Sequence, residues 1–222
     1  MILKSNLVEV REEVKECGRN IVLIGASKMQ SKETVDELMR VAPDFILGEN
    51  RVQELLAKYD PRYEWHFIGR LQTNKVKYIV DKVSLIHSLD RYELACEIEK
   101  QAAKINKIQP CLVEINMGAE LSKGGVDPKD AIGFIRSLEG FAHIRIDGIM
   151  SVMPNFGDTP ELNGLYEELY KLFESAKGIE QSNVNIKYLS AGMSGDYKIA
   201  LRHGANMLRL GRLIFGERPV AQ

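Results

Sequence analysis

The chain has 222 residues, a hydrophobic fraction of 45% and a formal net charge of -1, with 30 basic and 31 acidic residues. This length is enough to bury one large core, so we expect a single domain over residues 1–222. The balanced charge argues against nucleic acid as the main partner, because phosphate backbones attract a surplus of positive charge. The three cysteines show no C-x-x-C spacing and no apolar run reaches the length of a bilayer span, which favours a cytoplasmic protein without a membrane partner.

Short segments rich in Val and Ile alternate with segments of helical period, an alternation typical of βαβ units. After an N-terminal helix that ends near Gly18, eight strands are predicted, at Ile21–Ala26, Asp44–Leu47, Trp65–Ile68, Ser84–His87, Cys111–Met117, Arg145–Met150, Ile186–Leu189 and Met207–Leu210. The clearest helices are Lys32–Val41, Arg91–Lys104 and Glu161–Lys177.

Eight such units without a break in composition favour a (β/α)8 barrel with an extra N-terminal helix over a doubly wound sheet. The segments Gly118–Pro128 and Pro154–Pro160 are predicted loops after the fifth and sixth strands. Loops at the carboxyl ends of barrel strands carry the functional site, so we expect the site on that face.

The first predicted strand runs directly into Lys28. A strand period of two places Lys28 on the same face as Val22, Ile24 and Ala26. If that face lines the barrel, an apolar floor favours the uncharged amine, which can attack an aldehyde. The alternative is a solvated lysine at the start of the loop to the next helix.

Near the other end of the chain, two glycines and Ser194 precede a predicted helix at Tyr197–His203. Glycines let backbone N–H groups approach a ligand, a serine hydroxyl can donate, and a helix N-terminus favours an anion. This segment therefore predicts a phosphate site after the seventh strand. A plain loop with a Ser or Asp cap is an equal alternative.

The last predicted strand carries Arg209 on the same face as Met207 and Gly211. A charge in an apolar strand needs a partner. The arginine could donate to a pyridine nitrogen and, being always charged, disfavour protonation of that nitrogen. It could equally form a salt bridge with an acid of a neighbouring strand.

Three further polar residues fall in or after strands. Asn50 follows the second strand toward the site face, although a helix cap is the commoner role for asparagine there. His66 and His87 lie within or at the end of strands and are interpreted as structural. The sequence contains no metal-ligand cluster, no P-loop and no G-x-G-x-x-G motif.

A series of motifs, in order from about residue 21 to 218, resembles the pyridoxal-phosphate homeostasis proteins, also known as the proline-synthase co-transcribed family. The motifs are Ser27-Lys28, Gly48–Asn50 with Val52–Glu54, His66–Gly69, Leu71-Gln72 with Asn74-Lys75, Ile86–Ser88, Ser122-Lys123, Gly192–Asp196, and Arg209–Gly211 with Ile214–Gly216. Each motif alone is weakly specific, but the combination is highly specific.

The resemblance implies an alanine-racemase-type barrel with pyridoxal 5'-phosphate (PLP) held as a Schiff base on Lys28. It also implies phosphate contacts from Ser194, Gly195 and Gly211 and a ring-nitrogen contact from Arg209. The sequence departs from the family pattern at three positions: Arg70 replaces a common proline, Ala191 a common methionine, and Arg212 a small hydroxyl residue. Arg212 lacks the hydroxyl that would give one phosphate hydrogen bond in the family pattern, and its charged side chain could either replace that bond or reach solvent.

The leading hypothesis is a monomeric protein that stores PLP, limits the free aldehyde and passes the cofactor to PLP-dependent apoenzymes, without robust turnover. Alanine-racemase-type catalysis places a tyrosine base opposite the lysine, usually on a second domain of a partner subunit, and a chain of this length is too short to carry that domain. Two alternatives remain. One is a PLP-dependent racemase or lyase acting on amino acids, and the other is a cofactor-independent lysine aldolase acting on phosphorylated sugars.

Overall fold

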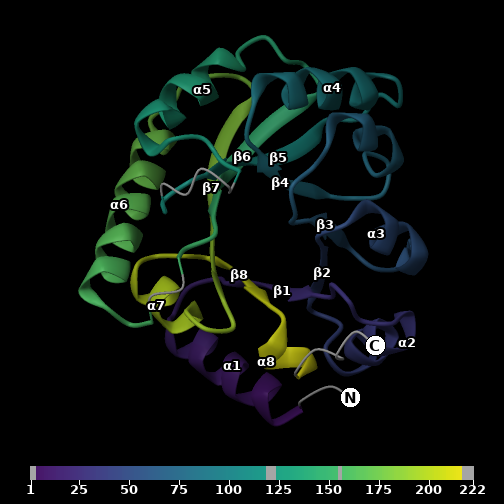
Figure 1. Ribbon diagram of the computed structural model, residues 1–222, viewed down its shortest axis with the longest axis vertical. Coiled ribbons are helices and arrows are strands. Elements are labelled where there is room, and N and C mark those ends of the chain that lie inside the picture. The colour runs from purple at the N-terminus through teal and green to yellow at the C-terminus, as the bar shows by residue number, and fades with distance from the viewer. Residues whose placement is uncertain (1–3, 119–123, 155–156, 217–222) are drawn as a thin grey trace.

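The computed structural model describes residues 4–118, 124–154 and 157–216. Eight parallel strands follow one another in chain order and close into a barrel (Figure 1). They are β1 (Val22–Ala26), β2 (Ile46–Glu49), β3 (Trp65–Phe67), β4 (Leu85–Leu89), β5 (Gln109–Ile115), β6 (Ile144–Ser151), β7 (Val184–Met193) and β8 (Met207–Leu210). The barrel closes where β1 pairs with β8, with Ile24 opposite Arg209. The predicted (β/α)8 barrel is confirmed.

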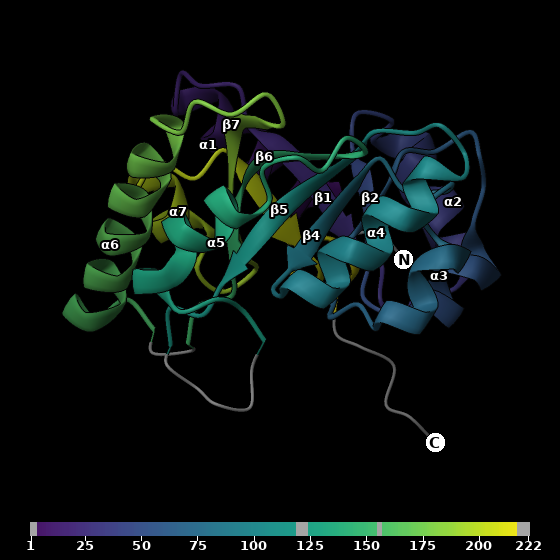
Figure 2. The same cartoon turned by 90° about the horizontal axis from the view of Figure 1, so that it is seen from above.

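Helices surround the ring of strands and cover its outer face (Figures 1 and 2). They are α1 (Lys4–Glu16), α2 (Lys32–Val41), α3 (Val52–Lys58), α4 (Tyr92–Ala103), α5 (Ala131–Ser137), α6 (Pro160–Lys177), α7 (Tyr197–Arg202) and α8 (Arg212–Phe215), with 3-10 turns η1 (Thr73–Tyr78) and η2 (Pro128–Asp130). The predicted N-terminal helix is α1, which is tied to α8 by a 2.8 Å hydrogen bond from Asn6 Nδ2 to the Leu213 carbonyl. None of the described helices is long and apolar enough to cross a bilayer.

The three clearest predicted helices form where they were expected, and in α2 and α6 local capping agrees with the apolar pattern. Ser31 caps α2 by accepting a hydrogen bond from Thr34 N, and Thr159 caps α6 by accepting one from Leu162 N. Pro160 occupies the first turn of α6, where its missing N–H costs nothing. Side-chain caps of this kind stabilise a helix by about 1 kcal/mol each.

Alternate residues of the strands enter two separate apolar regions. The larger region lies between the strands and the helices and includes Leu23 of β1. The smaller one fills the barrel interior and consists of Ile24, Leu85, Leu112, Met150 and Met207. Because side chains alternate along a strand, the next inward position toward each carboxyl end lies above this apolar floor.

The segment after the predicted seventh strand differs from expectation. β7 does not end at Leu189 but continues to Met193, with a shift in its pairing to β8 between Ser190 and Met193. Gly192 allows this path because its φ is +93° and a Cβ there would lie 2.6 Å from the Cβ of Ala200. The predicted loop is therefore partly strand, and it passes directly against α7.

We predict that Gly148 of β6 cannot be replaced, because a Cβ there would lie 1.9 Å from the carbonyl oxygen of Tyr188 in β7. Gly148→Ala should force two backbones apart and lower the midpoint of chemical unfolding strongly. Gly164→Ala is the matched control, since nothing lies within 4 Å of that Cβ in α6. It should raise the unfolding free energy by about 1 kcal/mol, the difference in helix propensity between alanine and glycine. Equal effects of the two variants would contradict this packing.

Candidate functional site

A cavity of about 390 Å³ opens at the carboxyl ends of the strands. Its wall contains every residue predicted for the site, namely Lys28, Asn50, Ser194, Gly195, Arg209, Gly211 and Arg212. Apolar side chains complete much of the wall, including those of Ile68, Val152 and Leu162. An apolar cavity of this size with a few convergent polar groups is typical of a small-molecule site.

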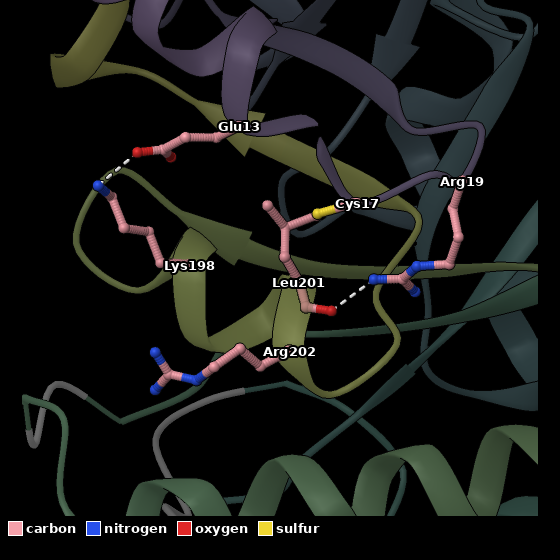
Figure 3. Close-up of a pocket in the computed structure, with 6 residues that line it drawn as sticks. All are labelled: Glu13, Cys17, Arg19, Lys198, Leu201 and Arg202. Carbon is pink, nitrogen blue, oxygen red and sulfur yellow. Dashed lines mark hydrogen bonds and ion pairs between the residues drawn. The ribbon is translucent and has the colours of Figure 1, made fainter. Parts of the chain in front are cut away.

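A second depression of similar volume lies outside the barrel, between α1 and α7 (Figure 3). Its cations already have partners. Lys198 is paired with Glu13, and Arg19 donates to the carbonyl oxygen of Leu201. These contacts fasten α1 to α7, so we place the functional site in the barrel mouth.

The backbone before Lys28 is held by buried polar contacts. Ser27 Oγ donates to Glu49 Oε1 at 2.7 Å, and Lys58 Nζ donates to the Ser27 carbonyl oxygen at 2.8 Å. Lys58 also forms an ion pair with Glu49, and both side chains are almost fully buried. These contacts fix the end of β1 and therefore the direction in which Lys28 leaves the strand.

The backbone after Lys28 is held as well. Met29 N donates to Glu54 Oε2 at 2.7 Å, and Met29 has a φ of +61°, a conformation that non-glycine residues seldom adopt. The half-buried Lys28 side chain lies in the cavity wall with Ala26. β1 ends at Ala26, so Lys28 reaches the cavity from the turn that follows the strand and not from the strand itself.

The sequence interpretation missed the buried pair Glu49–Lys58. One signal was present: in α3, Lys58 follows Val52 and Leu55 at three-residue intervals, so it lies on the helix's buried stripe. A lysine in that position needs an acid, and Glu49 at the end of an apolar strand is its partner.

Arg209 is 4% exposed and points into the barrel. Its Nη1 donates to the carbonyl oxygen and to Oγ of Ser190, at 2.8 and 2.7 Å, and its Nη2 donates to the Ser151 carbonyl oxygen at 2.8 Å. Burial lowers the pKa of the guanidinium from its ordinary value, although nearby Tyr166 and other acidic groups oppose that shift. The predicted alternative of a salt bridge is wrong within the described chain, where these neutral oxygens hold the arginine.

The loops after β7 and β8 meet at Ser194. Its Oγ accepts hydrogen bonds from Gly211 N at 3.2 Å and from Leu213 N at 3.1 Å. Gly195 is open, with nothing within 4 Å of a Cβ built on it. Ser194, Gly195 and Gly211 all line the cavity, where a hydroxyl and backbone N–H groups are the kinds of donor that bind a phosphate.

The predicted alternative, a loop with a Ser or Asp cap, is met only in position, because Asp196 occupies the N-cap of α7 but its side chain makes no cap hydrogen bond to the helix. Asp196 precedes α7 and accepts hydrogen bonds from Met193 N and from Tyr166 Oη, both at 2.6 Å. Asp196 therefore closes the turn before α7, while Ser194 and Gly195 line the cavity. Arg212 lies exposed at the cavity rim.

Asn50 does not cap a helix. The N-cap of α3 is Arg51, and Asn50 Oδ1 is buried without a hydrogen-bond partner. Gly69 packs against the backbone of Asn50: a Cβ built on Gly69 would lie 2.3 Å from the main-chain carbonyl oxygen of Asn50. A buried amide oxygen without a partner in a cavity wall is suited to a polar ligand.

Glu114 of β5 is a second acid that the sequence interpretation missed. Burial and, to a smaller extent, Asp90 raise its pKa to about 7, although Arg209 and Arg70 oppose the shift. Its Oε2 is buried and has no hydrogen-bond partner. The signal available was an acid within the apolar run of β5, on the same face as inward-pointing Leu112. Within the described residues, no group of three or more His, Cys, Asp or Glu is placed to hold a metal ion.

The family model described as alanine racemase, N-terminal domain, matches residues 7–219. A pyridoxal phosphate homeostasis protein of Aquifex aeolicus is 42% identical over 200 residues, covering 88% of this chain and 86% of the relative. This chain belongs to the pyridoxal phosphate homeostasis protein family. The corresponding protein of Helicobacter pylori strain 26695 is 32% identical over 203 residues, covering 89% of this chain and 88% of the relative.

Solved structures of the same architecture agree with this family. PipY of Synechococcus elongatus is 26% identical, and its structures without and with PLP bound superpose with TM-scores of 0.86 and 0.84, each covering 96% of this chain and 99% of PipY. The alanine racemase of Clostridium difficile, at 16% identity and a TM-score of 0.71, shares the fold over 94% of this chain and 56% of that chain. The motif Ser122-Lys123 of the family pattern lies outside the described residues.

The buried pair under Lys28 gives a stability prediction. Lys58→Met should cost about 3–5 kcal/mol of unfolding free energy, because it leaves the Glu49 carboxylate buried without a counter-charge. Combining it with Glu49→Gln should recover part of that loss. Lys171→Met, at an exposed pair with Glu167, is the control and should leave the unfolding midpoint close to wild type. A small effect of Lys58→Met would show that water reaches Glu49.

Glu114 gives a pH prediction. Its folded-state pKa of about 7 exceeds the ordinary value of 4.5, so between these values the folded chain keeps a proton that the unfolded chain has lost. The contribution of Glu114 to stability therefore falls as the pH rises through this range. Glu114→Gln should flatten the decline in unfolding midpoint between about pH 5 and about pH 8. An unchanged slope would contradict the raised pKa.

Proposed function

We propose that this chain binds PLP in the barrel-mouth cavity and holds it through the amine of Lys28. The observation that carries the proposal is that a lysine at the end of β1 and the donors around Ser194 line one cavity. Membership in the pyridoxal phosphate homeostasis protein family supports it, as does the solved PipY structure with PLP bound.

The polar groups of the wall correspond to the polar groups of PLP. Ser194, Gly195 and Gly211 would hold the phosphate, with Arg212 adding positive charge at the rim. The guanidinium of Arg209 would face the ring nitrogen. The side-chain N–H of Asn50 would donate a hydrogen bond to the ring oxygen.

When bound, PLP supplies an electrophilic aldehyde and an electron-accepting ring. Arg209 would keep the ring nitrogen unprotonated, because a guanidinium donates a hydrogen bond and does not accept a proton. A ring in that state accepts electrons less well than one paired with a carboxylate. This favours retention of the aldehyde over transformation of amino acids.

The cavity wall also favours storage and delivery over turnover. Its described titratable residues are Lys28, Asp196, Arg209 and Arg212. Asp196 is occupied by hydrogen bonds from Tyr166 and Met193, and burial raises the pKa of the Tyr166 phenol. We propose that the protein controls the free aldehyde as a cytoplasmic monomer and passes PLP to apoenzymes.

A PLP-dependent racemase or lyase is the second candidate, and Glu114 is the observation that favours it. A carboxyl group with a pKa of about 7, close enough to Arg209 to influence that pKa, could move a proton at neutral pH. Incubation of the loaded protein with a panel of amino acids, followed by chiral analysis, separates the two candidates. Turnover at ordinary enzyme rates would replace the storage proposal.

The proposed role of Lys28 is tested by titrating PLP into the protein and recording absorbance. Lys28→Ala should abolish the absorbance band of the covalently held cofactor and weaken binding by about tenfold or more, equivalent to ~1.4 kcal/mol, while the phosphate contacts remain. Lys32→Ala is the control, since Lys32 lies in α2 and pairs with Asp36. An undiminished band in Lys28→Ala would remove Lys28 from the site. A wild-type protein that takes up no PLP would instead favour the aldolase.

A further inference from the structure

A chain of polar side chains crosses the barrel interior from Arg209 to the opposite rim. Its members after the arginine are Ser190 in β7, His87 in β4 and His66 in β3, which are at most 3% exposed. The chain ends at Glu64, which immediately precedes β3 and whose side chain is about half exposed. These five residues are called the relay below.

Each link of the relay lies within polar contact distance. Arg209 Nη1 lies 2.7 Å from Ser190 Oγ, and that oxygen lies 3.1 Å from His87 Nδ1. His87 Nε2 lies 3.0 Å from His66 Nδ1, and His66 Nε2 lies 3.4 Å from Glu64 Oε1. The sequence interpretation treated the two histidines separately, but they are each other's partner.

The chemistry of the two ends sets the direction of every hydrogen bond. The Glu64 carboxylate only accepts, so a neutral His66 carries its proton on Nε2 and leaves Nδ1 as an acceptor. His87 must then carry its proton on Nε2 and donate to His66 Nδ1, which leaves its own Nδ1 as an acceptor. Ser190 Oγ therefore donates its proton to His87 Nδ1 and accepts from Arg209, because a guanidinium has only donors.

The charges agree with neutral imidazoles in the relay. Burial lowers the pKa of His66 and lowers that of His87 well below its ordinary value, and His66 and Arg209 lower the latter further. At the rim, the hydrogen bond with His66 lowers the pKa of Glu64, and Ser84 Oγ also donates to Glu64 at 2.7 Å. The carboxylate therefore stays charged at one end while the guanidinium stays charged at the other.

Arg209 is buried and has no carboxylate in direct contact within the described chain, although Asp196 and Glu114 are close enough to raise its pKa. Two neutral imidazoles that point their acceptor nitrogens toward it add to this negative potential, since aligned hydrogen bonds polarise one another in a low dielectric. The geometry points to Glu64 as a further, remote counter-charge of Arg209, with Ser190, His87 and His66 as positioning residues that couple the ligand site to the opposite rim of the barrel. The coupling rests on the proposed binding of PLP at Arg209.

The relay predicts that a change at Arg209 is felt at His66. The chain has four histidines, so side-chain ¹⁵N resonances can be assigned by comparing the wild type with His66→Gln and His87→Gln. Both relay histidines should carry their proton on Nε2. Titration of PLP into the wild-type protein should shift the resonances of both, and absorbance recorded in parallel shows whether PLP has bound.

Ser190→Ala is the variant that breaks the relay. It removes only the hydroxyl link, because the two backbone carbonyl contacts of Arg209 remain. PLP should still bind to this variant, but the shift at His66 should disappear. A shift that persists would reach His66 by another route and would overturn the inference. Binding of PLP to wild type without any shift at His66 would overturn it too.

A second pair of variants tests the relay without a ligand. Both change side chains that are about half exposed, so the fold should tolerate them. Glu64→Gln removes the charge but keeps an oxygen acceptor, so it should shift the His87 resonances, two links away. Asp81→Asn removes an exposed carboxylate from the same rim, one paired with Lys82, and should leave them unchanged. Equal responses, or a proton on Nδ1 of either histidine, would contradict the relay. Failure of PLP to bind would refute the proposed function alone.

Discussion

Closure of the parallel sheet is the constraint on which the rest of this structure depends. An eight-stranded barrel has an interior just wide enough for side chains, and every second residue of each strand must enter it. The lower part of this interior is filled by an apolar cluster that includes Ile24 and Met207. Polar side chains at the next inward positions have little access to water, so each needs a partner inside the protein.

The two buried cations near the site meet this requirement in different ways. Lys58 lies directly against the Glu49 carboxylate, and the pair fixes the backbone beside Lys28. Arg209 instead contacts neutral oxygens of Ser190 and Ser151. A direct pair suits a structural role, because its charges satisfy each other. A guanidinium held by neutral acceptors keeps much of its positive potential for a ligand in the cavity.

Sequence patterns predicted the ring of strands and the gathering of Lys28, Ser194 and Arg209, because both depend on local signals. Strand period, capping residues and the position of a side chain after a strand are visible within a few residues. The carboxyl ends of barrel strands then meet on one face by necessity. The family resemblance added the roles of these residues in PLP binding, which the residues alone left open.

Apart from the Glu49–Lys58 pair, whose signal was local, the contacts that sequence patterns did not predict depend on register between distant segments. His66 and His87 are 21 residues apart, and their rings meet only because neighbouring strands place both on the inward face. His87 and Ser190 are 103 residues apart. The raised pKa of Glu114 depends on how deeply β5 buries that carboxyl group. The extension of β7 to Met193 was not predicted, because it depends on the close approach of Gly192 to α7.

The most direct test of this account is to reduce the PLP-loaded protein with borohydride and map the modified peptide by mass spectrometry. We predict a single reduced adduct on Lys28, because that lysine lies in the cavity with the phosphate donors. An adduct on another lysine, or adducts spread over the surface lysines, would contradict the assignment of the barrel mouth as the PLP site.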